Sequence, residues 1–162
     1  MATRRAIRDS ARSSGRRAAS ETADDAFRYI ESSAVLAALL EQEPSAQKAI
    51  SMSGRRVTSA LTFSEAERGL VRARVSGRLS REAERAALRW LREFRRVCDV
   101  ASVTDSVLAR AGKPYPVEPI RTLDAIHLAT AESLGAPPQL ITLVTRDARI
   151  WDNAIALGYQ VE

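Results

Sequence analysis

The chain has 162 residues, of which 45% are apolar and 28% are charged, as is usual for one soluble domain with its own core. The chain has one cysteine, Cys98, and one histidine, His127, so it can form no internal disulfide and no Cys/His zinc site. A chain without an internal disulfide favours a reducing compartment, and we expect a cytoplasmic protein. No apolar run approaches the roughly 20 residues of a membrane span, so no membrane partner is expected.

The formal net charge of +5 is concentrated at the N-terminus, where residues 1–26 are expected to form a flexible, arginine-rich tail before one domain at residues 27–162. The first seventeen residues contain a single acid and six arginines: Arg4, Arg5, Arg8, Arg12, Arg16 and Arg17. Without this stretch the chain is close to neutral, so its charge is only weak support for nucleic-acid binding by the domain. The tail could itself supply sequence-independent, salt-sensitive affinity for RNA.

The domain is expected to begin with a strand at residues 27–30, followed by a helix that Ser33 caps. Pro44 ends that helix and opens another, which ends at Gly54. A second strand is expected at residues 55–58.

Two longer helices follow. The spacing of Thr62 and Glu65 is a capping-box pattern and predicts a helix to about residue 75. From Ser80, an amphipathic helix directs arginines outward and a set of apolar residues inward, either to the core or to a dimer surface: Ala83, Ala87, Trp90, Leu91 and Phe94.

The second half of the domain continues the alternation of strands and helices. A strand at residues 97–100 carries Cys98 as a small buried side chain, and Thr104 caps a helix to residue 111. Glycine and prolines make residues 112–119 a loop. The remaining elements are expected to be a helix at 123–134, a strand at 140–144, a helix at 147–157 and a short edge strand at 159–161.

This alternation predicts an α/β domain in which a parallel sheet of four to five short strands lies between two layers of helices. In such sheets, ligands bind beyond the carboxyl ends of the strands. Glu31 and Asp147 each follow a predicted strand directly, so both belong at this edge.

Four acids stand at the end of a predicted strand or the start of a predicted helix: Glu31, Glu65, Asp124 and Asp147. Hard cations such as Mg²⁺ and Mn²⁺ bind carboxylate oxygens, which a chain gathers by bringing distant element ends together. Such a cluster indicates metal-assisted hydrolysis of a phosphodiester. The alternative for Glu65, Asp124 and Asp147, each taken singly, is a structural role at a helix N-terminus.

Four motifs occur in order between residues 27 and 161: Tyr29-Ile30-Glu31-Ser32-Ser33-Ala34, Ser59-Ala60-Leu61-Thr62-x-x-Glu65, Leu123-Asp124-Ala125-Ile126-His127-Leu128-Ala129-Thr130-Ala131 and Leu143-Val144-Thr145-Arg146-Asp147. Each is weak alone, but the ordered set resembles the PIN-domain family, and within it the VapC-type toxin ribonucleases of type II toxin–antitoxin systems. The resemblance implies a Mg²⁺- or Mn²⁺-dependent endoribonuclease that cleaves RNA, forms a homodimer and is neutralised by an antitoxin protein over its acidic cleft.

The same resemblance assigns the site. It implies catalytic roles for Glu31, Glu65, Asp124 and Asp147, of which Glu31, Asp124 and Asp147 would bind the metal. Ser33 and Thr145 match supporting hydroxyl positions. Glu31 departs from the family, which almost always has aspartate there, and its extra methylene adds about 1.5 Å of reach to a site that needs near-ideal octahedral geometry.

Other side chains near these acids have open interpretations. Arg146 and Arg149 could bind RNA phosphates as substrate-binding residues or could form a solvated helix face. His127 lies one helical turn after Asp124, and packing, or support of a metal-binding residue, is favoured over direct metal binding. Trp151 and Asp152 follow Asp147 closely; Asp152 is expected to be a surface residue, and the sequence leaves the role of Trp151 open.

Two further functions compete with a ribonuclease. Because of Glu31, the chain could be a catalytically weakened or inactive PIN-like module that binds RNA or an antitoxin. A third possibility is a nuclease directed at DNA, or a dimerisation domain that uses the long amphipathic helices.

Overall fold

The structure is a computed structural model and describes residues 27–162; the predicted arginine-rich tail lies outside the described residues. Within this range, five parallel strands form one sheet in the order β3-β2-β1-β4-β5. The central strand β1 pairs with both β2 and β4, so Phe27 lies between Arg55 and Ile141. The strands are β1 (Phe27–Ile30), β2 (Arg55–Ser59), β3 (Asp99–Ala101), β4 (Ile141–Val144) and β5 (Gln160–Val161).

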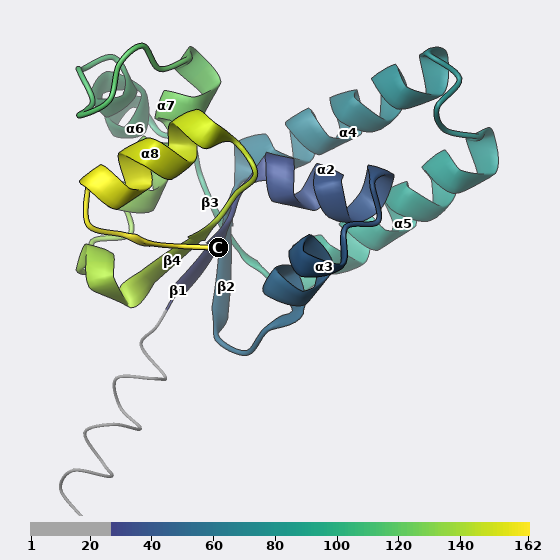
Figure 1. Cartoon of the computed structure of the whole chain (residues 1–162), viewed down its shortest axis with the longest axis horizontal. Helices are drawn as coiled ribbons and strands as arrows, with labels where there is room; N and C mark the ends of the chain where they lie inside the picture. Colours follow the sequence, from purple (N-terminus) through teal and green to yellow (C-terminus); the bar gives the residue numbers. More distant parts are fainter. Residues whose placement is uncertain (1–26) are drawn as a thin grey trace, which may run out of the picture.

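Helices cover both faces of this sheet, which confirms the predicted α/β/α arrangement (Figure 1). One layer contains α2 (Ser32–Leu40), α3 (Pro44–Ser51), α4 (Ala60–Val75) and α5 (Arg81–Arg96). The other contains α6 (Asp105–Ala111), α7 (Thr122–Glu132) and α8 (Ala148–Ala156), with a short 3-10 turn, η1 (Pro138–Leu140), before β4. The α4–α5 pair extends beyond the sheet as an arm (Figure 1).

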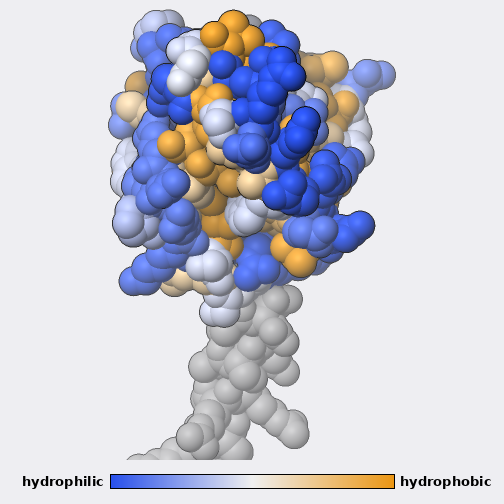
Figure 2. Space-filling view, turned by 90° about the vertical axis from the view of Figure 1, so that its right-hand side faces the viewer, coloured by the Kyte–Doolittle hydropathy of each residue, from blue (hydrophilic) through white to orange (hydrophobic). Residues whose placement is uncertain are grey.

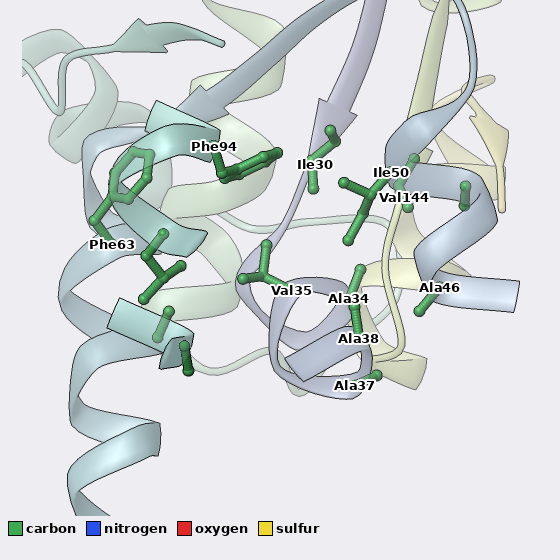
Figure 3. Close-up of a cluster of buried hydrophobic side chains, with 14 of the residues drawn as sticks. Ile30, Ala34, Val35, Ala37, Ala38, Ala46, Ile50, Phe63, Phe94 and Val144 are labelled. Carbon is green, nitrogen blue, oxygen red and sulfur yellow. The ribbon is translucent and has the colours of Figure 1, made fainter. Parts of the chain in front are cut away.

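The sheet separates two hydrophobic cores because neighbouring side chains along a strand point to opposite faces. In β1, Ile30 packs into the core beneath α2 to α5, whereas Tyr29 packs into the core beneath α7 and α8. Figure 3 shows the first core, in which Ile30 and Val144 of the sheet face Val35 of α2. These strands are buried on both faces, as expected for a parallel sheet between helices.

Several predicted boundaries are wrong, and the reasons are local. Glu31, rather than Ser33, caps α2, because its carboxylate accepts the Ser33 backbone N–H. Ser59 caps α4, so the capping-box prediction at Thr62 and Glu65 is wrong. Thr62 already lies within the helix, and its hydroxyl accepts a hydrogen bond from Thr58 at the end of β2.

Two further corrections concern the segment from α5 to β3. Ala83 and Trp90 are exposed, whereas Leu91 and Phe94 are buried as predicted, so the inward face of α5 is narrower than the sequence pattern indicates. Trp90 instead lies flat on Phe94, with ring centroids 5.0 Å apart. Cys98 precedes β3 and is only partly buried, because the strand begins at Asp99.

Hydrophobic side chains also reach the surface. Viewed from the side of the α4–α5 arm, they form a strip between hydrophilic flanks (Figure 2). Val75, at the end of α4, is 73% exposed. None of the helices within residues 27–162 combines the length and the apolar character needed to cross a bilayer.

Candidate active site

Glu31 stands where β1 ends and α2 begins, at the carboxyl edge of the sheet, and its side chain is buried. One carboxylate oxygen, Oε1, accepts a hydrogen bond from the Ser32 hydroxyl at 2.6 Å. The other, Oε2, accepts from the Ser33 N–H at 3.0 Å, from the Thr145 hydroxyl at 3.0 Å and from the Ser33 hydroxyl. The hydroxyls of Ser33 and Thr145, which the sequence indicates as supporting groups, therefore both donate to the Glu31 carboxylate. The bond from Thr145 connects Glu31 to the end of β4.

Glu65 approaches the same place from the second turn of α4, where its partner is His127 of α7. Glu65 Oε2 lies 2.6 Å from His127 Nε2, and Glu31 Oε1 lies 3.7 Å from the same nitrogen. The other ring nitrogen, Nδ1, is 3.0 Å from the hydroxyl of Tyr29. Glu31, Glu65 and His127 thus each offer one ligand atom, and these three atoms lie within 4.8 Å of one another.

Asp124 lies in the first turn of α7, one turn before His127. Its Oδ2 is buried and has no hydrogen-bond partner within the described residues. Burial raises the pKa of Asp124 above its ordinary value, and the nearby negative charges of Asp147 and Glu31 raise it further. The carboxylates are therefore close enough to repel one another, although Asp124 is not in the 4.8 Å cluster.

Asp147 is the fourth predicted acid, and it caps α8. Its Oδ1 accepts the backbone N–H groups of Arg149 at 2.8 Å and Ile150 at 3.3 Å, while its own N–H donates to Thr145 Oγ1 at 3.1 Å. The structural role anticipated for this residue is therefore real. The charge of Asp147 still acts on Asp124, so the capping role and membership of the acidic site are compatible.

The two predicted phosphate-binding arginines are in different environments. The Arg146 guanidinium is occupied: Nε lies 2.9 Å from Glu43 Oε1, Nη1 donates to the Thr145 carbonyl at 2.9 Å, and Nη2 donates to the Ser45 hydroxyl at 3.0 Å. Arg149 is exposed and has no acidic partner within residues 27–162.

A cavity of about 450 Å³ lies beside the fourth acid. Thr145 and Asp147 line it together with Trp151, which is 38% exposed, and with the exposed Asp152 predicted to lie on the surface. An aromatic side chain is therefore accessible next to the acidic site, which the sequence left undecided.

The donor set fits a divalent cation. Carboxylates from both helical layers come together at the carboxyl edge of the sheet, and one buried oxygen of Asp124 has no hydrogen-bond partner among the described residues. A buried unpaired carboxylate oxygen is costly, and a cation is the partner that would satisfy it. His127 also lies in this group, although the sequence favours packing or a supporting role for it over metal binding.

Comparison with known proteins agrees with this architecture. The family described as PIN domain matches residues 28–155. The chain belongs to the PIN-domain family. It is 40% identical over 135 residues to ribonuclease VapC46 of Mycobacterium tuberculosis, an alignment that covers 82% of this chain and 94% of VapC46. Both the predicted family and its VapC-type branch are thereby confirmed.

Solved structures share the PIN fold at low sequence identity. VapBC2 from Rickettsia felis, solved with a DNA fragment from its promoter, superposes with a TM-score of 0.58 at 14% identity, covering 84% of this chain and 97% of that one. PAE2754 from Pyrobaculum aerophilum gives a TM-score of 0.55 at 21% identity, covering 85% and 83%. At these identities the likeness concerns the fold alone.

Proposed function

We propose that this PIN-domain protein is a Mg²⁺- or Mn²⁺-dependent endoribonuclease and the toxin component of a toxin–antitoxin pair. The observation that carries the proposal is the buried Asp124 oxygen, which has no hydrogen-bond partner among residues 27–162, beside the cluster of Glu31, Glu65 and His127. The 40% identity to a protein named as a ribonuclease supports the same activity.

Glu31, Glu65, Asp124 and Asp147 are the proposed catalytic acids, with Glu31, Asp124 and Asp147 in direct contact with the metal. When bound, a divalent cation polarises a phosphoryl group and increases the acidity of a water that attacks it. Ser33 and Thr145 hold the Glu31 carboxylate by hydrogen bonds, so it needs little rearrangement to act as a ligand.

The substrate side of the proposal depends on exposed positive charge beside the acids. Arg149 follows Asp147 by two residues and is free of acidic partners within residues 27–162, so its guanidinium is available to an RNA phosphate. Arg146 would have to leave Glu43 to do the same, and it is the weaker candidate.

The partner side of the proposal is a cognate antitoxin, a homodimeric state and a cytoplasmic location. Support comes from a similar fold solved in a toxin–antitoxin complex from Klebsiella pneumoniae, which has a TM-score of 0.51 at 17% identity and covers 76% of this chain and 89% of that one.

The decisive experiment is cleavage of a labelled single-stranded RNA by the full chain with Mg²⁺, with Mn²⁺ and with a chelator, beside the Asp124→Ala variant. We expect metal-dependent cleavage that Asp124→Ala reduces by at least about 100-fold. Asp99→Asn, at an exposed acid away from the cluster, serves as the matched control. Cleavage that persists in Asp124→Ala or in chelator would refute the proposal, and preference for a DNA competitor would redirect it to a DNA nuclease.

A further inference from the structure

The chain contains one histidine, and it lies inside the acidic cluster. His127 is 1% exposed, yet Nε2 faces two carboxylates, at 2.6 Å from Glu65 and 3.7 Å from Glu31. An octahedral ion with bonds near 2.1 Å requires neighbouring donor atoms about 3 Å apart. The two observed separations lie on either side of that value, so small side-chain shifts would give all three atoms one common ion.

The second ring nitrogen has the partner that a metal-bound imidazole needs. A metal-binding histidine usually donates its other N–H to an oxygen, which fixes the ring and its tautomer. Here Nδ1 lies 3.0 Å from the Tyr29 hydroxyl, and Tyr29 is fully buried in β1. A tyrosine hydroxyl can accept a hydrogen bond, so it can take the Nδ1–H.

We propose that His127, through Nε2, and Glu65 add two ligands to the metal site of Glu31, Asp124 and Asp147, and that this nitrogen makes the site select a first-row transition-metal dication over Mg²⁺. The inference deepens the proposed function and rests on it. In this arrangement the neutral imidazole would carry its proton on Nδ1, directed at Tyr29, which would leave the Nε2 lone pair available to the ion.

The selectivity follows from ligand chemistry. Mg²⁺ favours oxygen donors and retains its water molecules, whereas first-row transition metals bind imidazole readily. A site with oxygen donors alone discriminates weakly between Mg²⁺ and Mn²⁺. Replacing one oxygen donor by a buried nitrogen shifts the preference toward Mn²⁺, which serves as the probe because it is paramagnetic.

The test is pulsed electron paramagnetic resonance of the full, metal-loaded chain with no added histidine tag. We expect nitrogen hyperfine coupling to bound Mn²⁺ that changes from the ¹⁴N to the ¹⁵N pattern when histidine is isotopically labelled. Because the chain has a single histidine, this coupling can come only from His127. Calorimetry should show Mn²⁺ affinity falling by at least about 10-fold in His127→Gln, with Mg²⁺ affinity changing by less than about 3-fold.

The spectrum of the unaltered protein decides the matter even if His127→Gln fails to fold. Bound Mn²⁺ without histidine coupling, in a protein that cleaves RNA, would overturn the ligand assignment and leave the proposed function intact. His127 would then act only by positioning Glu65. Absence of both Mn²⁺ binding and metal-dependent cleavage would overturn the inference together with the function on which it rests.

Discussion

Replacing Asp124 by asparagine should stabilise the metal-free protein while removing its response to metal. In the folded chain, Asp124 has a buried oxygen with no hydrogen-bond partner among the described residues, and it is repelled by Asp147 and Glu31. Asparagine has nearly the same shape, carries no charge and offers an N–H₂ group that can donate to the neighbouring carboxylates. The folded state should therefore gain from the change, whereas the exposed unfolded state should not.

The size of the gain follows from the cost of an unsatisfied buried group, about 1–3 kcal/mol. Because Asp124 is only partly buried, we expect a gain of about 1 kcal/mol in the free energy of unfolding. For a chain of this size, that corresponds to a rise in Tm of about 2–4 °C. In saturating Mn²⁺ the order should reverse, because the ion stabilises the unaltered protein and binds the variant less tightly.

The gain should also depend on pH. The pKa of Asp124 in the folded protein is raised above its ordinary value of 3.8, so the folded state binds more protons than the unfolded state between these two values. The free energy of unfolding of the unaltered, metal-free protein therefore falls as pH rises through that window. The advantage of asparagine should be complete above the folded-state pKa and absent below the unfolded-state pKa.

Thermal unfolding followed by circular dichroism, in chelator and in Mn²⁺, measures each of these effects. Asp99→Asn is the control, since its exposed pairing with Arg55 is worth at most about 1 kcal/mol and should not respond to metal. A lower Tm for Asp124→Asn in chelator, or an equal response of both variants to Mn²⁺, would refute the reasoning.

Three further predictions concern the rest of the site. Shortening Glu31 to aspartate should lower the rate of RNA cleavage by about 10-fold or more, because the shorter carboxylate moves away from the hydroxyls that now donate to it at 2.6–3.0 Å. A sharp rise in the rate would instead identify a naturally weakened nuclease. Asn153→Ala should reduce the free energy of unfolding by about 2 kcal/mol in urea titration, since its buried amide bonds both the N–H and the carbonyl of Val117 at 2.9 and 2.8 Å; an unchanged midpoint would contradict this. Arg149→Glu should weaken RNA binding and reduce the salt dependence of the affinity, whereas Arg92→Glu, also exposed but on α5, should have a smaller effect in the same fluorescence titration; equal losses would place the RNA elsewhere.

The order of elements and the edge at which the acids gather could be predicted from the sequence because both depend on local patterns. Apolar runs bounded by breakers identify β4, and parallel pairing then directs the residues that follow its end, such as Asp147, to one edge. Glu65 was expected in a capping box at the start of its helix, but it lies in the second turn of α4. The sequence does not separate the two cases, because a capping box and successive turns within a helix can show the same residue spacing.

The role of His127 could not be read from local sequence for a different reason. Its partners are Tyr29, which lies 98 residues earlier, and Glu65, which lies 62 residues earlier. No periodicity or spacing reports such long-range contacts. The same limit applies to Arg146, whose ion pair with Glu43 spans 103 residues. The pair occupies a guanidinium that the local sequence suggests is available to bind phosphate.

The central position of β1 has a consequence for biosynthesis. This strand is the first of the sheet to be made, yet one of its two neighbours, β4, is translated more than a hundred residues later. Sheets that depend on such distant pairings form slowly, because a long loop must close, at a cost in chain entropy, before the strand contacts can compensate for that cost. A ribosome-bound chain that has not yet exposed β4 lacks both Thr145 and Asp147, so catalytic competence would arise only after β4 and the residues that follow it have emerged. For an enzyme proposed to cut RNA, this order of events would keep the growing polypeptide harmless to the message that encodes it.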